Sequence, residues 1–408
     1  MEKANIPKIR FDKFNDDWEQ RKLGEYVSIT SGEAPSKFEV GTELYVKVDD
    51  LNYNDKYVVD TQNKVAEHST VKRVTKGSVV FPKRGAAIMT NKVRIMGIDS
   101  YMDTNMMALT SEKLDSEFLY NIISKEGLYK IADTSTIPQI NNKHVEPYEV
   151  TIPSFDEQAK IGEYFSNLDN LITLHQRKYE KLQMIKKSML EKMFPQNGEK
   201  KPEIRFEGFT DDWEQRKLLS CIQSITDFRG RTPKKLGMDW SESGYLALSA
   251  LNVKDGYIDF SQDVHYGNQE LYDKWMSGKE LHRGQVLFTT EAPMGNVAQV
   301  PDNKGYILSQ RTIAFDVEEE ILSENFLATL LRTPNVFNDL TALSSGGTAK
   351  GVSQKSLSGL DVVIPKNIDE QNKLADYFIN LDHLITLHQR KLEKLRNIKK
   401  SMLEKMFV

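Results

Sequence analysis

Residues Glu157 to Phe194 read EQAKIGEYFSNLDNLITLHQRKYEKLQMIKKSMLEKMF, and residues Glu370 to Phe407 repeat them as EQNKLADYFINLDHLITLHQRKLEKLRNIKKSMLEKMF. The two copies share 29 of 38 residues. A shorter pair, PKIRFDKFNDDWEQRKL from Pro7 to Leu23 and PEIRFEGFTDDWEQRKL from Pro202 to Leu218, shares 13 of 17. The segments between these repeats differ strongly. The 408-residue chain therefore alternates variable and constant parts and predicts two similar halves.

Apolar residues recur at steps of four and three along both long copies, which is the heptad pattern of a coiled coil. A helix of 38 residues is about 57 Å long. The equivalent histidines favour a polar pair that fixes helix register over metal binding or catalysis. The predicted seam consists of Ile161, Phe165, Leu168, Ile172, His175, Tyr179 and Leu182 in the first copy and Leu374, Phe378, Leu381, Ile385, His388, Leu392 and Leu395 in the second.

The order of the segments along the chain constrains how the two helices pair. The first variable domain precedes the first helix, and the second follows it after the short linker PQNGEKKP, so the domains are expected at opposite ends of that helix. The second helix starts from the second domain and can pair with the first only in the antiparallel sense. Two similar halves around such a pair predict a pseudo-two-fold arrangement, which suits a two-fold ligand such as duplex DNA.

The variable segments are expected to fold as mixed α/β (α+β) domains. Short strand-like runs lie at 44–52, 77–82, 101–109 and 148–153 and again at 245–252, 284–290, 306–315 and 360–365. Helical patterns occupy 116–133 and 323–340. The predicted organisation is a variable domain at 1–155, a central helix and linker at 156–200, a second variable domain at 201–368 and a C-terminal helix at 369–408.

Composition points to an ordinary globular chain, with 39% hydrophobic and 28% charged residues. Neither a membrane span nor a secretion signal is evident, so a cytoplasmic location is expected. The single cysteine, Cys221, is expected in a core. The net charge of −4 is unfavourable for phosphate binding, but Lys and Arg outnumber Glu by six to two over 176–192 and by seven to two over 389–405.

Polar residues able to read base edges follow the central strands of both variable segments, because Arg, Lys, Asn and Gln can form paired hydrogen bonds with guanine or adenine. Polar residues are common in turns of any kind, so an ordinary turn is the favoured interpretation of each position taken singly. The candidates in the first domain are Lys83, Arg84, Thr90, Asn91, Lys92, Arg94, Gln139, Asn141, Asn142 and Lys143. Those in the second are Thr289, Thr290, Glu291, Asn296, Thr348, Lys350, Gln354 and Lys355, together with the cluster Arg229, Arg231, Lys234 and Lys235, which suits phosphates or is a solvated loop.

Sequence motifs of several enzyme classes are missing. The chain has no G-x-x-x-x-G-K-[ST] loop, no FxGxG followed by an NPPY-like motif, no HExxH and no G-x-S-x-G elbow. A convincing metal-nuclease arrangement is missing too. The sequence therefore predicts a chain without catalytic residues or a metal site of its own.

The whole chain resembles the specificity (S) subunit of type I restriction-modification systems. The resemblance rests on the WEQRKL segments at Trp18 and Trp213, the runs KGSVVF and RGQVLF, the helix entries IPSFDEQ and IPKNIDEQ, and the HQRKxEKL helices, all duplicated in one order. It implies two target recognition domains, each reading one half of a bipartite, asymmetric site in double-stranded DNA. The helical pair would set the gap between the halves.

The resemblance also implies partner proteins. Two methylation (M) subunits would carry S-adenosylmethionine and methylate adenine, and restriction (R) subunits, with ATP and Mg²⁺, would cut unmodified DNA. No cofactor is expected on this chain itself. Two other readings remain open: a protein-binding scaffold or adaptor without DNA recognition, which would lack salt-dependent DNA affinity, and a stand-alone nuclease or methyltransferase, which would turn over substrate in isolation.

Overall fold

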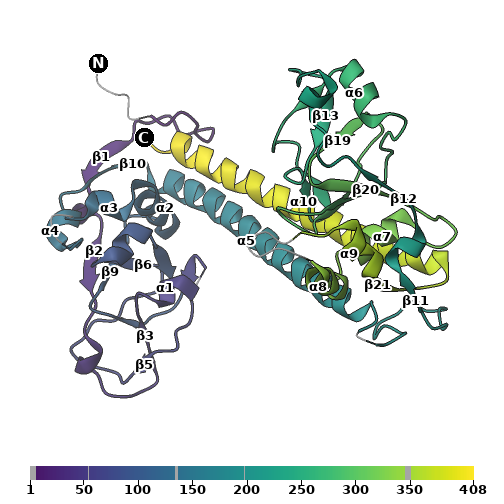
Figure 1. The fold of residues 1–408 in the computed structure, drawn as a ribbon. Helices are drawn as coiled ribbons and strands as arrows, with labels where there is room; N and C mark the ends of the chain where they lie inside the picture. Colours follow the sequence, from purple (N-terminus) through teal and green to yellow (C-terminus); the bar gives the residue numbers. More distant parts are fainter. Residues whose placement is uncertain (1–5, 54, 134–136, 197, 345–350) are drawn as a thin grey trace. The chain divides into compact units, whose positions relative to one another are not determined.

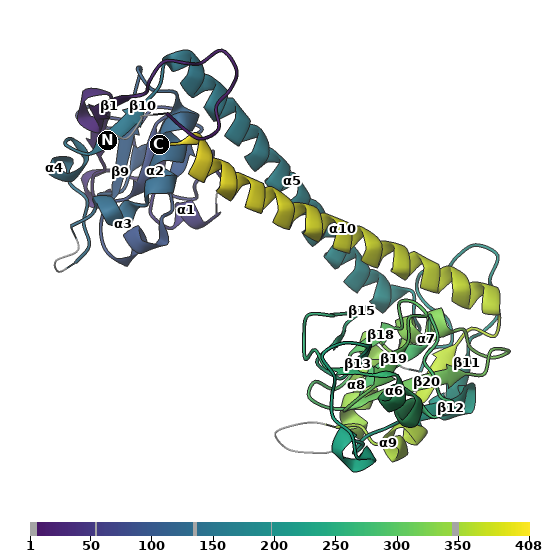
Figure 2. The same cartoon turned by 90° about the horizontal axis from the view of Figure 1, so that it is seen from above.

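The computed structural model describes residues 6–53, 55–133, 137–196, 198–344 and 351–408. The chain divides into two compact units. The first unit comprises residues 1–177 and 389–408, and the second comprises residues 178–388. Each unit thus contains one variable domain, the beginning of one long helix and the end of the other (Figures 1 and 2).

The first unit is built around a five-stranded sheet with the order β2 (Ser28–Ser31), β9 (Met106–Thr110), β6 (Val79–Pro82), β7 (Arg94–Met96) and β4 (Tyr57–Val58). A three-stranded sheet contains β5 (Lys64–Val65), β3 (Glu43–Val46) and β8 (Tyr101–Met102), and β1 (Glu19–Lys22) pairs with β10 (Glu149–Ile152). Its helices are α1 (Asp50–Tyr53), α2 (Ser116–Glu126), α3 (Leu128–Ile131), α4 (Asn142–Val145) and the first part of α5 (Phe155–Lys192).

The second unit repeats this plan with a four-stranded sheet in the order β12 (Ile222–Asp227), β20 (Thr312–Val317), β17 (Val286–Thr289) and β18 (Val297–Gln299). Three smaller sheets pair β16 (Tyr266–Gly267), β13 (Tyr245–Leu248) and β19 (Tyr306–Leu308); β14 (Val253–Lys254) with β15 (Tyr257–Ile258); and β11 (Glu214–Lys217) with β21 (Asp361–Ile364). Its helices are α6 (Gln269–Met276), α7 (Glu324–Leu330), α8 (Pro334–Leu343), α9 (Gln354–Gly359) and the first part of α10 (Ile368–Met406).

Two runs that the sequence suggests as single strands are each divided in two by a turn. Residues 101–109 form β8 and β9, because the Asp103 carboxylate accepts a hydrogen bond from the backbone N–H of Asn105 at 2.8 Å and closes a tight turn. Residues 306–315 form β19 and β20, with Arg311 between them at φ 62°. Polar residues inside an apolar run mark a turn in both units.

The two repeated sequence motifs contact each other at the start of each long helix. The Arg10 guanidinium donates two hydrogen bonds to the buried Glu157 carboxylate, both at 2.7 Å. In the second unit Arg205 binds Glu370 in the same way, at 2.7 and 2.8 Å. Paired, charge-assisted hydrogen bonds of this kind hold two groups in a defined geometry. This contact explains why the opening motif and the helix are repeated together.

Each domain core is completed by the end of the helix that begins in the other unit. In the first unit Phe407 stacks on Phe118 with ring centroids 5.4 Å apart and packs edge-on against Trp18 at 6.1 Å. In the second unit Phe194 stacks on Phe326 at 5.9 Å and packs edge-on against Trp213 at 5.9 Å. The two aromatic clusters therefore bring together segments of the chain that are far apart in the sequence.

Within each unit the long helices pair in the antiparallel sense. In the first unit Asp169 accepts a hydrogen bond from Lys399 at 2.5 Å and Gln176 accepts one from Arg396 at 3.2 Å, so residue numbers rise on α5 as they fall on α10. Every residue of the predicted seam is buried or half-buried. Leu171 and Leu174, by contrast, are 44% and 46% exposed.

Removing the aromatic ring of Phe407 should destabilise the first unit much more than the second. Burial of the ring predicts a loss of about 3–5 kcal/mol for Phe407→Ala. Phe194→Ala should show the reverse pattern, and Val408→Ala, at an exposed neighbouring position, should have little effect. Hydrogen exchange followed by mass spectrometry, with peptides from β6 and β17 as reporters, would measure this. If either Phe→Ala variant destabilised both units equally, this result would contradict the exchange of helix ends.

Candidate nucleic-acid interface

Three loops of the first unit meet beside the end of β6. The Lys83 backbone N–H donates to the Asn105 carbonyl at 2.8 Å, and the Lys83 carbonyl accepts from Ile140 N–H at 2.8 Å. Gly85 N–H donates to the Pro138 carbonyl at 2.7 Å. Residues 83–85, 103–105 and 138–140, here called the first loop edge, are thus joined through backbone groups.

Several candidate side chains lie on or next to the first loop edge. Arg84 and Gln139 face each other across an isolated antiparallel bridge, and both are exposed. Lys83 is half-buried, and burial lowers the pKa of its ammonium although Glu33 and Asp103 oppose this effect. The neighbouring exposed residues Asn141, Asn142 and Lys143 begin α4, where Asn141 forms a reciprocal capping box with His144.

Four other candidates of the first domain hold its own loops together. Asn91, at φ 48°, donates a hydrogen bond to the Ser124 carbonyl at 2.9 Å and accepts one from Leu128 N–H at 3.0 Å. Arg94 donates to the Leu51 carbonyl at 2.8 Å, and burial lowers the pKa of its guanidinium. Thr90 donates to the Ala87 carbonyl at 2.6 Å, and Lys92 donates to the Asn52 side chain.

The second unit builds an equivalent edge from equivalent loops. The Thr290 backbone N–H donates to the Arg311 carbonyl at 2.8 Å, and the Thr290 carbonyl accepts from Val352 N–H at 2.9 Å. Glu291 forms an isolated bridge with Gly351. Residues 289–291, 310–311 and 351–352 form the second loop edge. Its backbone construction matches that of the first edge, whereas its side chains differ.

Charged side chains of both signs lie along the second loop edge. Glu291 contacts Arg311 at 3.3 Å, with both side chains about half exposed. The Arg229 guanidinium binds Asp227 through paired hydrogen bonds, and this contact, more than the nearby Glu291 charge, raises the pKa of Arg229. Arg231 stacks on the Phe228 ring at 4.0 Å, and its carbonyl accepts a hydrogen bond from the Gln310 side chain.

The remaining candidates of the second domain fall into three groups. Thr289 and Thr290 are buried, and Asn296 donates to the Val253 carbonyl at 2.9 Å, so these three support the loop from within. The exposed group, at the starts of short helices, contains Lys234, Lys235, Gln354 and Lys355. Thr348 and Lys350 lie outside the described residues.

The candidate residues do not include the turn residues of the two loop edges, which are Asp103, Thr104 and Asn105 in the first and Gln310 and Arg311 in the second. They occupy the turns between β8 and β9 and between β19 and β20. The available signal was the polar interruption of an apolar run, DTN in one unit and SQR in the other.

The described part of the chain contains neither a metal site nor a membrane-spanning helix. No three His, Cys, Asp or Glu side chains converge there as a metal site would require. None of its helices combines the length and apolar character needed to cross a bilayer.

Comparison with known proteins gives consistent matches over the whole chain. The family model described as the type I restriction modification DNA specificity domain matches residues 15–184 and again residues 210–397. The MjaVIII type I restriction enzyme specificity subunit of Methanocaldococcus jannaschii is 23% identical over 95% of this chain and 91% of its own length. The putative MjaX specificity subunit of the same organism is 21% identical over 98% and 95%.

Among solved structures, the chain superposes on the S subunit of a type I restriction-modification system from M. genitalium with a TM-score of 0.65. That likeness covers 99% of both chains at 14% identity. At this low identity the superposition demonstrates a common fold.

The hydrogen bonds of Asn91 predict a structural role. Asn91→Ala removes both hydrogen bonds. It also puts alanine in a left-handed backbone conformation, which asparagine tolerates better. We therefore expect the first unit to lose about 1–3 kcal/mol of stability. Arg84→Ala, at an exposed position, should stay within about 0.5 kcal/mol. Chemical denaturation compares the two variants. A neutral Asn91→Ala would return this residue to the group of potential DNA contacts.

Proposed function

Since this chain belongs to the type I restriction-modification DNA specificity family, we propose that its two loop edges each read one half of a bipartite, asymmetric site in double-stranded DNA. The observation that carries the proposal is the common construction of the two edges. Both are joined by backbone hydrogen bonds from the end of the central strand, yet they present different side chains. A common support with different reading groups is what recognition of two different half-sites requires.

The side chains at the first edge suit direct base reading. Arg forms paired hydrogen bonds with guanine, and Gln does so with adenine. Arg84 and Gln139 are exposed next to each other and provide both. At the second edge Arg311 provides a guanine reader and Glu291 an acceptor for the cytosine amino group. Exposed Lys234, Lys235 and Lys355 suit phosphate contacts, which position a protein without selecting sequence.

The long helices support the rest of the assembly proposed here. The equivalent pairs Leu171 with Leu174 and Leu384 with Leu387 are all 44–46% exposed, within a sequence that is identical in both repeats. Two identical surfaces call for two copies of one partner, and the proposed partner is the M subunit. S-adenosylmethionine would be carried by the M subunits, and ATP and Mg²⁺ by the R subunits.

Each loop edge should control its own half-site. In a complex with its M subunit, Arg84→Ala should relax base selection in the first half-site alone, at about 1–3 kcal/mol per base contact. Arg311→Ala should relax base selection in the second half-site alone. Gln354→Ala, just past the second loop edge at the start of α9, should do the same. Mapping methylated adenines in a host that lacks its own modification measures both halves together. Lys234→Ala should weaken the binding of all DNA sequences equally, because a phosphate contact does not depend on sequence.

The methylation map, together with the salt dependence of DNA binding, distinguishes DNA recognition from a protein-binding scaffold. One bipartite motif that appears only when this chain is present supports DNA recognition, and the affinity of the complex for DNA should fall steeply with rising salt. A stable complex with the M subunit but with no mark and no salt-dependent DNA affinity would favour a scaffold.

A further inference from the structure

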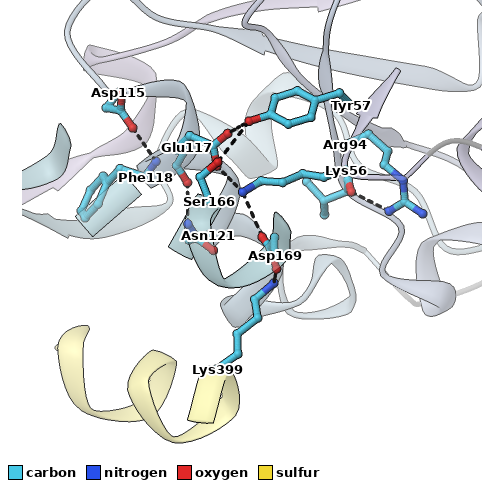
Figure 3. A network of polar contacts seen from close by, with 11 residues as sticks. Lys56, Tyr57, Arg94, Asp115, Glu117, Phe118, Asn121, Ser166, Asp169 and Lys399 are labelled. Atoms are coloured by element: carbon cyan, nitrogen blue, oxygen red, sulfur yellow. Dashed lines mark hydrogen bonds and ion pairs between the residues drawn. The ribbon is translucent and has the colours of Figure 1, made fainter. Parts of the chain in front are cut away.

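A buried ionic network joins the variable domain of the first unit to both long helices (Figure 3). The Lys56 ammonium, from the turn before β4, lies 2.9 Å from the Asp169 carboxylate on α5 and also contacts Glu117 on α2. Asp169 in turn accepts a hydrogen bond from Lys399 on α10 at 2.5 Å. The side chains of Lys56, Asp169 and Glu117 are only 9–16% exposed. One carboxylate thus binds a cation from the domain and a cation from the second helix.

The second unit contains the corresponding network. Asp382 on α10 binds Lys186 on α5 at 2.6 Å and Arg332, which follows α7, at 2.8 Å. Arg332 also contacts Asp255, in the turn between β14 and β15. Each network therefore combines two cations with two carboxylates and carries no net charge.

The helix side of the two networks is constant and the domain side is not. Asp169 and Asp382 occupy one position of the repeat, and Lys399 and Lys186 occupy another. Each domain supplies one cation and one carboxylate, but from different residues. The cation that binds the constant Asp is Lys56 in the first unit and Arg332 in the second. The domain carboxylate is Glu117 in the first unit and Asp255 in the second.

Both networks consist of charged groups. Burial by itself lowers the pKa of Lys56, but Asp169 and Glu117 outweigh burial, and the pKa lies above its ordinary value. The same balance, with Asp255 and Asp382 as the partners, raises the pKa of Arg332. A buried ion pair adds little net stability compared with apolar residues of similar size, but its loss leaves an uncompensated charge. The ionic network therefore contributes to the orientation of the domain more than to its stability.

The network adds a directional contact next to an apolar one. The aromatic cluster around Phe165 and Phe407 is apolar, and apolar contact is non-directional. Asp169 lies one turn further along α5, about 6 Å from Phe165 along the helix axis. With the Arg10–Glu157 contact at the start of α5, the network gives the domain directional contacts at two positions along the helix, and two such positions restrict its orientation more than one.

We propose that the constant pairs Asp169 with Lys399 and Asp382 with Lys186 are docking points that hold each variable domain in one orientation, and that they thereby define how strictly the gap between the two half-sites is measured. These are positioning residues without contact to DNA. The inference rests on the proposed function and adds to it a determinant of gap selectivity outside the loop edges.

The test uses the full chain in complex with its M subunit and a pool of DNA sites whose two halves are separated by different gaps. The wild-type complex should methylate one gap preferentially. Asp169→Asn should keep both half-site sequences but reduce the preference for that gap over its neighbours by about tenfold, the equivalent of about 1.4 kcal/mol. Asp382→Asn should act in the same way from the second unit.

The matched control is Asp55→Asn. Asp55 also forms a pair between domain and helix, with Arg177 at 2.7 Å, but both side chains are more than 60% exposed. An exposed pair contributes little, so gap preference should stay unchanged. Lys399→Met is the second test variant, since it removes a cation at the helix surface and leaves Lys56 to neutralise Asp169. It decides the question if Asp169→Asn does not fold.

The docking role and the proposed function are contradicted by different outcomes. Unchanged gap preference in folded Asp169→Asn and Lys399→Met would overturn the docking role. A changed half-site sequence in either variant would overturn it too, because it would assign these residues to base reading. A wild-type complex that marks no bipartite motif would refute the proposed function itself.

Discussion

The exchange of helix ends between the two units is the constraint on which the rest of the structure depends. Phe407 fills the aromatic core around Trp18 and Phe118, and Phe194 fills the corresponding core around Trp213 and Phe326. Neither variable domain can bury its core with its own contiguous segment. Both long helices must therefore run their full length to place the phenylalanine that follows each of them, which is consistent with the identity of the repeat through SMLEKMF.

This dependence divides the chain into constant support and variable edges. Constant contacts such as Arg10 with Glu157 and Arg205 with Glu370 fix each domain at the start of its helix. The loop edges are joined mainly through backbone groups, at Lys83 in one unit and Thr290 in the other. Backbone hydrogen bonds do not depend on side-chain identity. The side chains at the edges can therefore change while the loops stay in place.

The sequence was sufficient for the features that depend on local periodicity. The heptad seam predicts both long helices, and the order of segments predicts their antiparallel pairing. The turns inside 101–109 and 306–315 were missed, because apolar clustering outweighed the polar residues Asp103 and Arg311. Asn91 and Arg94 are candidate base readers by sequence, and both donate hydrogen bonds to main-chain carbonyls in other segments of the first unit, which the sequence did not indicate.

The ionic networks were beyond sequence reasoning for a related reason. Lys56 and Asp169 are 113 positions apart, and Asp169 and Lys399 are 230 apart. Single charged residues at such separations carry no periodic signal.

The two loop edges differ in charge as well as in sequence, and this difference limits the kind of DNA site that the proposed function allows. The first edge presents Arg84 and Gln139, whereas the second presents Glu291 paired with Arg311. Under the proposed function Glu291 suits a base edge better than the DNA backbone, because a phosphate would repel its carboxylate. Under the proposed function, edges that share their support but not their side chains would read two half-sites of different sequence.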